Sequence, residues 1–415
     1  MNTAGEIKKT EIQKSAIIKK IIAIIFIVMI FLCGILTGIF GAREIGAGML
    51  IGYKASLPAN PSIMDHINGI IDTCEVKMNS AFIAESPLIN LYGTMQKVIG
   101  RRIINDMVDR YTVYKLRNGQ LTWLYPEYDM TENINNFAEL NDSLMKLGTP
   151  IIYVQAPFKI NKYDNQLPYG LEDTTNRMTD KFLEGIQTAG VKTLDLRETI
   201  NKEGMDYGSL FFNTDHHWKP EAGLWATSVI AETLEEDYGF TLDDSLFDFY
   251  NYEITTYKRW FLGSQGKRVG TGYAGVDDIE LIIPKFETNF AFSIPSKEVT
   301  RAGNFSETML FMENIEKMDY FNLDPDKVYT GANYPLNIIY NKNSDNKKKI
   351  LLVRDSFSRV VAPFLAMACE ELHIIDPRHF SEMKLERYVE QVEPDIVIYL
   401  YNPSILIKNG AGEDS

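Results

Sequence analysis

The chain has 415 residues and a formal net charge of −14 at pH 7. This excess of negative charge disfavours nucleic acid as a partner, because a phosphate backbone repels an acidic surface. With three cysteines, no C-x-x-C pair and no Cys/His ligand cluster, the sequence predicts neither a structural zinc site nor a bound cofactor. A disulfide between Cys74 and Cys369 stays open, since a sequence does not show whether two thiols are close.

Residues 21–42 form an apolar run without a charge. As a helix they would span roughly 33 Å, enough to cross the hydrocarbon core of a bilayer, which is about 30 Å thick. Five lysines precede the run and only Arg43 and Glu44 follow it closely, so residues 1–20 are predicted to be a cytoplasmic tail. We expect a single-pass signal anchor in the cell membrane. A cleaved signal peptide is the alternative, but its apolar core is usually only about 7 to 15 residues long.

The rest of the chain is therefore expected outside the cell. Residues 1–42 carry +3, so residues 43–415 carry −17. Residues 43–87 mix glycine, proline and serine with short apolar runs, and we interpret them as a juxtamembrane stalk. Residues 88–415 are long enough for one large extracytoplasmic domain.

Strand and helix patterns alternate at both ends of this domain. An apolar run at 150–155 is followed by an amphipathic pattern at 171–189 and a second apolar run at 191–196. Strand, helix and strand in this order are typical of a parallel sheet covered by helices. We therefore predict an α/β fold with a central parallel sheet. Further strands are expected at 120–125, 349–354, 372–375 and 396–401, and further helices at 131–147, 356–369 and 381–391.

Residues 236–349 lack a long helical pattern and are rich in Tyr, Phe, Asn and Gly. Short strand patterns such as 279–284 occur within them, and we interpret the segment as a large mixed insertion that walls the site. The aromatic residues at 250–260 either stack on sugar rings or belong to the core.

Residues 213–220, Asn-Thr-Asp-His-His-Trp-Lys-Pro, hold the densest cluster of catalytic residue types. They follow an apolar run at 209–212, read as a strand, and precede a helix that tolerates proline in its first turn. Two-residue spacing places Asp215 and His217 on one side of an extended backbone, where the carboxylate can orient the imidazole. The alternatives are a capping role for Asp215 with histidines packed on a tryptophan, and, less favoured, a metal site.

Ser356 stands where the apolar strand at 349–354 runs into a helix. A serine at such a turn is presented at the edge of the sheet, and the backbone N–H groups of the first helical turn can stabilise an oxyanion. The alternative is an ordinary N-cap, in which Asp355 or Ser356 satisfies the same N–H groups. Because a loop with Asp215 and His217 is also present, we predict Ser356 as a nucleophile.

Weaker candidates could complete an oxyanion hole or contact substrate. The glycine-rich segment 263–268 lacks the Lys-Ser/Thr ending and the following helix of a phosphate loop, so a turn is the alternative. The candidates are Gly263, Ser264, Arg268, Asn402 and Trp218.

The chain resembles the DHHW family of Gram-positive membrane-anchored proteins over roughly residues 90–410. The motif Asp215-His216-His217-Trp218 carries the resemblance, together with the segments 261–264, 273–278, 354–357 and 399–402. The family is similar, more distantly, to SGNH-like periplasmic proteins that O-acetylate alginate, in which Asp-x-His-Trp precedes a serine near the C-terminus. Asp355 departs from that group, which has a small residue before the serine.

The resemblance implies an SGNH-like fold and a catalytic triad of Asp215, His217 and Ser356. It also implies an O-acetyltransferase that modifies a cell-surface polysaccharide or cell-wall polymer and receives acyl groups from a multispanning membrane-bound O-acyltransferase. A carbohydrate esterase with the same site is one alternative, since only the acceptor differs. A non-catalytic polysaccharide-binding or assembly protein is the other.

Overall fold

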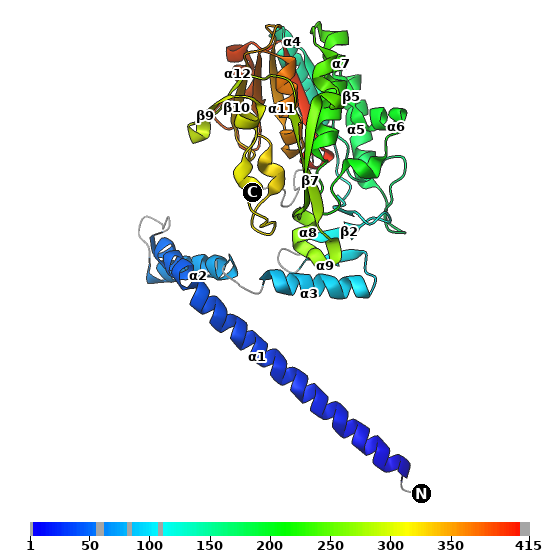
Figure 1. Cartoon of the computed structure of the whole chain (residues 1–415), viewed down its shortest axis with the longest axis vertical. Coiled ribbons are helices and arrows are strands. Elements are labelled where there is room, and N and C mark those ends of the chain that lie inside the picture. Colours follow the sequence, from blue (N-terminus) through cyan, green and yellow to red (C-terminus); the bar gives the residue numbers. More distant parts are fainter. Residues whose placement is uncertain (1–2, 55–61, 81–84, 107–110, 407–415) are drawn as a thin grey trace. The chain divides into compact units, whose positions relative to one another are not determined.

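The computed structural model describes residues 3–54, 62–80, 85–106 and 111–406 (Figure 1). The chain forms two compact units, residues 1–89 and residues 90–415. The first holds α1 (Thr3–Lys54), α2 (Ile63–Ser80) and the start of α3 (Glu85–Val98). Within the described residues, no helix combines the length and the apolar character that a membrane span requires. The anchor at 21–42 stays a prediction.

The second unit is built on an eight-stranded sheet with the order β5-β4-β13-β11-β12-β10-β8-β9. The first five strands are parallel, as predicted, whereas β10, β8 and β9 add to the edge of the sheet in antiparallel pairs. The predicted central parallel sheet is therefore part of a larger mixed sheet, because strands of the insertion at 236–349 extend it. The strands are β4 (Ile151–Gln155), β5 (Lys192–Asp195), β8 (Phe290–Ile294), β9 (Val299–Gly303), β10 (Leu336–Asn341), β11 (Lys349–Arg354), β12 (Glu371–Ile375) and β13 (Ile396–Tyr401).

Helices cover both faces of this sheet (Figure 1). Along β11, Ile350 and Leu352 belong to one apolar cluster, and Leu351 and Val353 belong to another. This alternation buries both faces of the strand, which explains its continuous apolar sequence. The first cluster includes residues of α7 (Pro220–Tyr238) and α10 (Phe305–Met309), with α6 (Leu196–Glu203), and the second includes residues of α4 (Thr131–Lys146), α5 (Thr174–Thr188) and α12 (Leu385–Val392).

Two small sheets complete the unit. A three-stranded sheet consists of β1 (Ile103–Asn105), β2 (Thr112–Lys115) and β3 (Leu121–Thr122), so the strand expected at 120–125 is a short edge. The hairpin of β6 (Tyr252–Phe261) and β7 (Asp277–Pro284) is connected through α8 (Ser264–Val269) and α9 (Thr271–Ala274). The segment 263–268, expected to be a turn, is thus mostly helical.

Two further predictions of secondary structure are wrong. The helix expected at 356–369 is divided into η7 (Ser356–Val360), α11 (Ala362–Leu365) and η8 (Ala366–Ala368). Pro363 has no N–H group to continue the helix from η7, so a new helix begins around it. The strand expected at 209–212 is the end of a 3₁₀ turn, η1 (Tyr207–Leu210), followed by a single bridge between Phe211 and Trp218.

Cys74 and Cys369 are both free thiols. Cys74 lies in α2 and is partly exposed, whereas Cys369 is buried at the end of η8. Neither forms a disulfide in the structure.

Candidate active site

Three predicted residues meet at the end of the central sheet. Ser356 follows β11 directly, and its Oγ lies 2.8 Å from Nε2 of His217. On the other side of the imidazole, Nδ1 of His217 lies 2.6 Å from Oδ1 of Asp215. All three residues are buried, and His217 is the most accessible of them at 6% exposure. A hydroxyl, an imidazole and a carboxylate therefore lie in one chain of hydrogen bonds.

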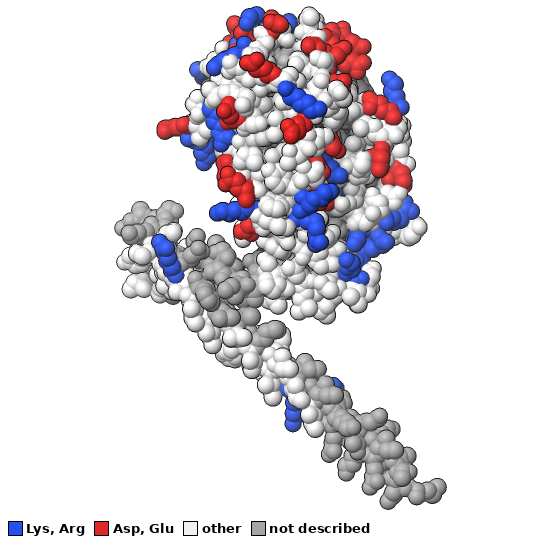
Figure 2. All heavy atoms as spheres, in the orientation of Figure 1, with Lys and Arg blue, Asp and Glu red and all other residues white. Residues whose placement is uncertain are grey.

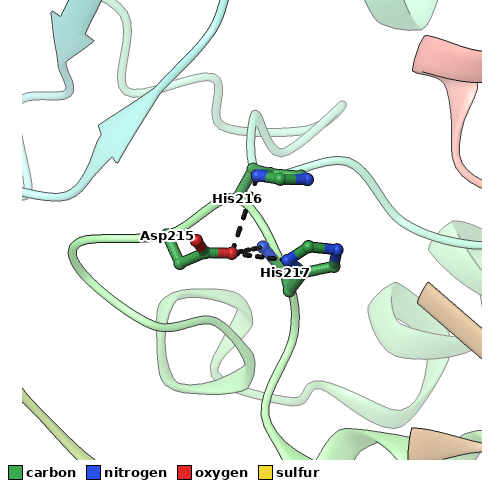
Figure 3. A group of neighbouring side chains, drawn as sticks. All are labelled: Asp215, His216 and His217. Atoms are coloured by element: carbon green, nitrogen blue, oxygen red, sulfur yellow. Dashed lines mark hydrogen bonds and ion pairs between the residues drawn. The ribbon is translucent and has the colours of Figure 1, made fainter. Parts of the chain in front are cut away.

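Asp215 is fixed by three donors. Its Oδ1 accepts hydrogen bonds from the backbone N–H and the ring of His217, and its Oδ2 accepts one from the N–H of Ser264 at 2.6 Å. Burial raises the pKa of Asp215, but His216, His217 and these hydrogen bonds outweigh burial and hold the pKa well below 3.8. The carboxylate is thus ionised and faces the imidazoles, as Figure 3 shows.

The carboxylate in turn favours a protonated His217. Burial lowers the pKa of this imidazole, but the charge of Asp215 and its hydrogen bond more than compensate, so the pKa is raised above 6.5. Because Nδ1 faces an ionised carboxylate, it carries the proton, and Nε2 is left to accept one from Ser356. This is the tautomer that a general base requires.

The N-cap role falls to Asp355 and not to Ser356. Oδ1 of Asp355 accepts a hydrogen bond from Phe357 N–H at 2.9 Å, and its other oxygen accepts one from Asn402 N–H at 2.6 Å. The hydroxyl of Ser356 is therefore available for His217. The hydrogen bond to Asp355 also occupies the backbone N–H of Phe357, one of the first-turn N–H groups that were expected to stabilise an oxyanion.

His216 lies beside the triad and not within it. Its ring packs against that of His217, tilted by 37° with centroids 3.9 Å apart, and its Nδ1 lies 3.1 Å from Ser264 Oγ. Among the described residues, Asp215, His216 and His217 offer ligand atoms within 4.8 Å of one another, a spacing that a metal ion would accept (Figure 3). Three of the ring nitrogens of His216 and His217 already form hydrogen bonds, with Asp215, Ser264 and Ser356.

A small pocket with about 10 Å³ of free space opens over the serine. Besides Ser356 and His217, its lining is mainly apolar, and a buried ion pair between Arg359 and Asp326 forms its polar part. The apolar lining consists of Phe212, Trp218, Pro220, Ile279, Tyr329, Phe357 and Val360.

Two buried charged residues that were not among the predicted site residues, Lys159 and Asp277, bind the loop that carries Asp215 and His217. Nζ of Lys159 donates to the carbonyl oxygens of Asn213 and Asp215, at 3.1 and 2.5 Å. Asp277 accepts four hydrogen bonds from the backbone and side chains of Asn213 and Thr214, all within 3.0 Å. Burial lowers the pKa of Lys159 to about 7, with Asp277 and Asp215 opposing the shift.

A signal for both residues was present in the sequence. Lys159 follows β4, and side chains after parallel strands gather at the site edge of a sheet. Asp277 lies in the segment 273–278 that carries part of the family resemblance. Their partners lie in a loop that is distant in the sequence, so no local pattern indicated this role.

The structure gives the weaker candidates other partners. Gly263 N–H donates to Thr214 Oγ1, and a Cβ at this glycine would lie 2.1 Å from the Cβ of Asp215. Arg268 pairs with Asp106 and stacks over Tyr111. The remaining contacts are those of Ser264 with Asp215 and His216, of Asn402 Nδ2 with Pro157 O at 3.1 Å, and of Trp218 Nε1 with Phe357 O at 2.8 Å.

A serine after a central strand and an Asp-x-His loop define an SGNH hydrolase-like domain. Residues 116–248, which include this loop, match the family model of the SGNH hydrolase-like domain of the acetyltransferase AlgX. The predicted resemblance to SGNH-like acetyltransferase domains is confirmed for residues 116–248. No curated protein sequence matches the chain significantly.

Solved structures share the fold. PatB1 of Bacillus cereus, solved with a sulfonyl adduct, superposes with a TM-score of 0.59 at 18% identity, covering 72% of this chain and 96% of PatB1. A DHHW family protein from Eubacterium siraeum gives a TM-score of 0.54 at 15% identity, covering 75% of this chain and 96% of its own. At these identities the likeness concerns the fold.

Proposed function

We propose that the protein is a membrane-anchored serine O-acyltransferase that uses Ser356, His217 and Asp215 on an acyl donor, with acetyl as the group transferred. The observation that carries the proposal is the hydrogen-bonded chain from Ser356 Oγ through His217 to Asp215, at 2.8 and 2.6 Å. Both distances are those expected of a nucleophile, its base and the group that orients the base.

The proposed reaction has two steps. His217 Nε2 accepts the proton of Ser356 while Oγ attacks the acyl carbon, and the donor alcohol leaves with that proton, so an acyl-serine forms. A hydroxyl of the acceptor then loses its proton to His217 and attacks the acyl-serine, which regenerates Ser356. Asp215 stabilises the imidazolium in both steps.

The pocket supports a short acyl group. Its free space is only about 10 Å³, and its apolar wall leaves little place for a charged acyl chain. The Arg359–Asp326 ion pair lines the same pocket, and its two charges largely neutralise each other.

The setting of the reaction is proposed from the sequence and from α1. Large apolar side chains of α1, such as Phe26 and Phe31, are more than half exposed in this chain, which supports residues 21–42 as an anchor. Residues 1–20 would then be cytoplasmic and residues 88–415 extracellular. A multispanning membrane-bound O-acyltransferase is proposed as the acyl donor, and a cell-surface polysaccharide or cell-wall polymer as the acceptor.

The serine mechanism is tested on the full chain in detergent with 4-nitrophenyl acetate. Hydrolysis should fall by at least about 10³-fold in Ser356→Ala and His217→Ala, because either change breaks the triad. Mass spectrometry should find an acetyl group on Ser356 of the parent after reaction with the ester, or a sulfonyl group after treatment with a sulfonyl fluoride, which releases fluoride. Ser358→Ala is the matched control, since Ser358 is also buried in η7 but does not contact His217. Equal rates in all variants would exclude the mechanism.

Transfer and hydrolysis are separated by the acceptor. An acetylated oligosaccharide, seen as the mass gain of one acetyl group, should form faster than acetate when an acceptor glycan is added. Release of acetate alone, unchanged by any glycan, would favour the esterase.

A further inference from the structure

Helix α3 carries an exposed apolar stripe on the unit that holds the active site. Leu91, Met95, Val98 and Ile99 are 56%, 59%, 80% and 63% exposed, and Ile103 in β1 continues the stripe at 44%. The spacing of four, three and one residues places the helical members on one face. Exposed apolar residues in a continuous stripe mark an interaction surface more often than scattered ones do.

The opposite side of α3 is tied to the body of the unit. Gly93 is buried, and a Cβ there would lie 1.7 Å from the carbonyl oxygen of Val269 in α8. Asn90 accepts hydrogen bonds from the backbone and side chain of Thr271, and Lys97 Nζ donates to Gly272 O at 3.2 Å. The helix is thus held rigidly while its apolar face points outward.

Basic residues border the stripe in a chain that is otherwise acidic. Residues 86–105 contain Lys97, Arg101 and Arg102 and no acidic residue, although the whole chain carries −14. All three basic residues are exposed. In Figure 2 the end of the unit with α3, α8 and α9 shows mainly white and blue spheres, and the largest red cluster lies at the other end.

We infer that this face of α3 docks on the surface of an anionic lipid bilayer. An apolar stripe flanked by lysine and arginine is the pattern of helices that lie in the membrane interface, where the apolar side chains enter the acyl boundary and the cations contact phosphate headgroups. The inference rests on the proposed membrane attachment. A second protein surface would match the apolar stripe, whereas the flanking cations favour phosphate headgroups.

Docking through α3 would bring the catalytic loop toward the membrane. α8, which packs on Gly93 at its last residue, has six residues and is thus about 9 Å long. At its first residue, Ser264 N–H donates to Asp215. One short helix therefore connects α3 with the loop that carries Asp215.

The test uses the full chain in vesicles and a pair of matched methionines. Cys33→Ala and Cys74→Ala remove reactive thiols, while Cys369 stays because burial raises the pKa of its thiol and keeps it unreactive. Met95→Cys then places an environment-sensitive dye on the stripe. Met145→Cys is the control, since Met145 lies on α4 with 60% exposure against 59% for Met95. Retained hydrolysis of 4-nitrophenyl acetate shows that each labelled variant is folded.

In vesicles with phosphatidylglycerol, the dye at position 95 should shift to the blue, be quenched by brominated lipid and be protected from iodide. The dye at position 145 should show no blue shift, should not be quenched by brominated lipid and should remain accessible to iodide. Arg101→Gln with Arg102→Gln should reduce the quenching by lipid, as should high salt. Equal iodide access at both positions would overturn the inference.

Two other outcomes would also overturn it and can be distinguished. Protection from iodide without quenching by lipid would mean that protein covers the stripe, either residues 1–89 or a second copy. If the chain does not float with vesicles, the anchor and the docking face both fail, whereas ester hydrolysis reports independently on the triad.

Discussion

Nε2 of His217 lies 2.8 Å from Oγ of Ser356, although 139 residues separate the two positions in the chain. The contact forms because the Asp-His loop and η7 meet at the end of β11. It converts a buried hydroxyl into a nucleophile with its base already in place.

The first prediction concerns pH. His217 must be neutral to accept a proton, and its pKa is raised above 6.5, so kcat/KM should rise with pH through an apparent pKa above that value. Asp215→Asn removes the charge that raises the pKa, so the profile should shift to lower pH. The rate should also fall, by up to about 10⁴-fold as for the serine protease triad. A pH–rate profile that is unchanged in this variant would contradict the assignment.

The second prediction concerns the buried charges behind the loop. Lys159→Met removes a hydrogen bond from each of two carbonyl oxygens, and Asp277→Asn weakens four hydrogen bonds to Asn213 and Thr214. Each change should destabilise the fold by about 1–3 kcal/mol in urea titrations. Because the loop positions Asp215, kcat should fall more than KM rises, and a fall in stability alone with normal kcat would contradict a positioning role.

The third prediction concerns Gly263. A methyl group there would lie 2.1 Å from Cβ of Asp215, so Gly263→Ala should displace the carboxylate and lower kcat by about 10²-fold, the cost of roughly 1 Å of misplacement. Gly208→Ala is the control, because its nearest neighbour, Asp206 Oδ1, is 3.5 Å away. Steady-state ester hydrolysis is measured for both variants. Equal rates would contradict the prediction, because the loop would then accommodate the methyl group without displacing Asp215.

The fourth prediction concerns the size of the acyl group. The parent should hydrolyse 4-nitrophenyl acetate faster than the butyrate, and Ile279→Ala should narrow this ratio because Ile279 lines the pocket. The truncation should cost about 2–5 kcal/mol of stability. Ile282→Ala, a change at an equally buried residue of β7 outside the pocket lining, should cost as much and leave the ratio unchanged.

The fifth prediction separates the triad from a metal site at Asp215, His216 and His217. If the three residues act through hydrogen bonds, dialysis against EDTA should leave ester hydrolysis unchanged, since no step of the proposed reaction needs an ion. Loss of activity that zinc restores, measured together with metal content, would replace the serine mechanism with a metal-assisted one.

Local patterns predicted much of the framework. The apolar run at 396–401 became β13 with the same bounds, and the helix expected at 131–147 became α4 with one residue fewer. The spacing of Asp215 and His217 also indicated their contact, because two residues apart in an extended loop their side chains share a side. These features depend on neighbours along the chain, and the sequence by itself therefore determined them.

Only the tertiary structure decided which distant groups meet. It paired Ser356 with His217, gave the N-cap to Asp355, and set Lys159 and Asp277 around the loop. It also joined β8, β9 and β10 to the central sheet in antiparallel order. Such contacts depend on how strands stack and which buried polar groups need partners, and these are satisfied across the whole fold.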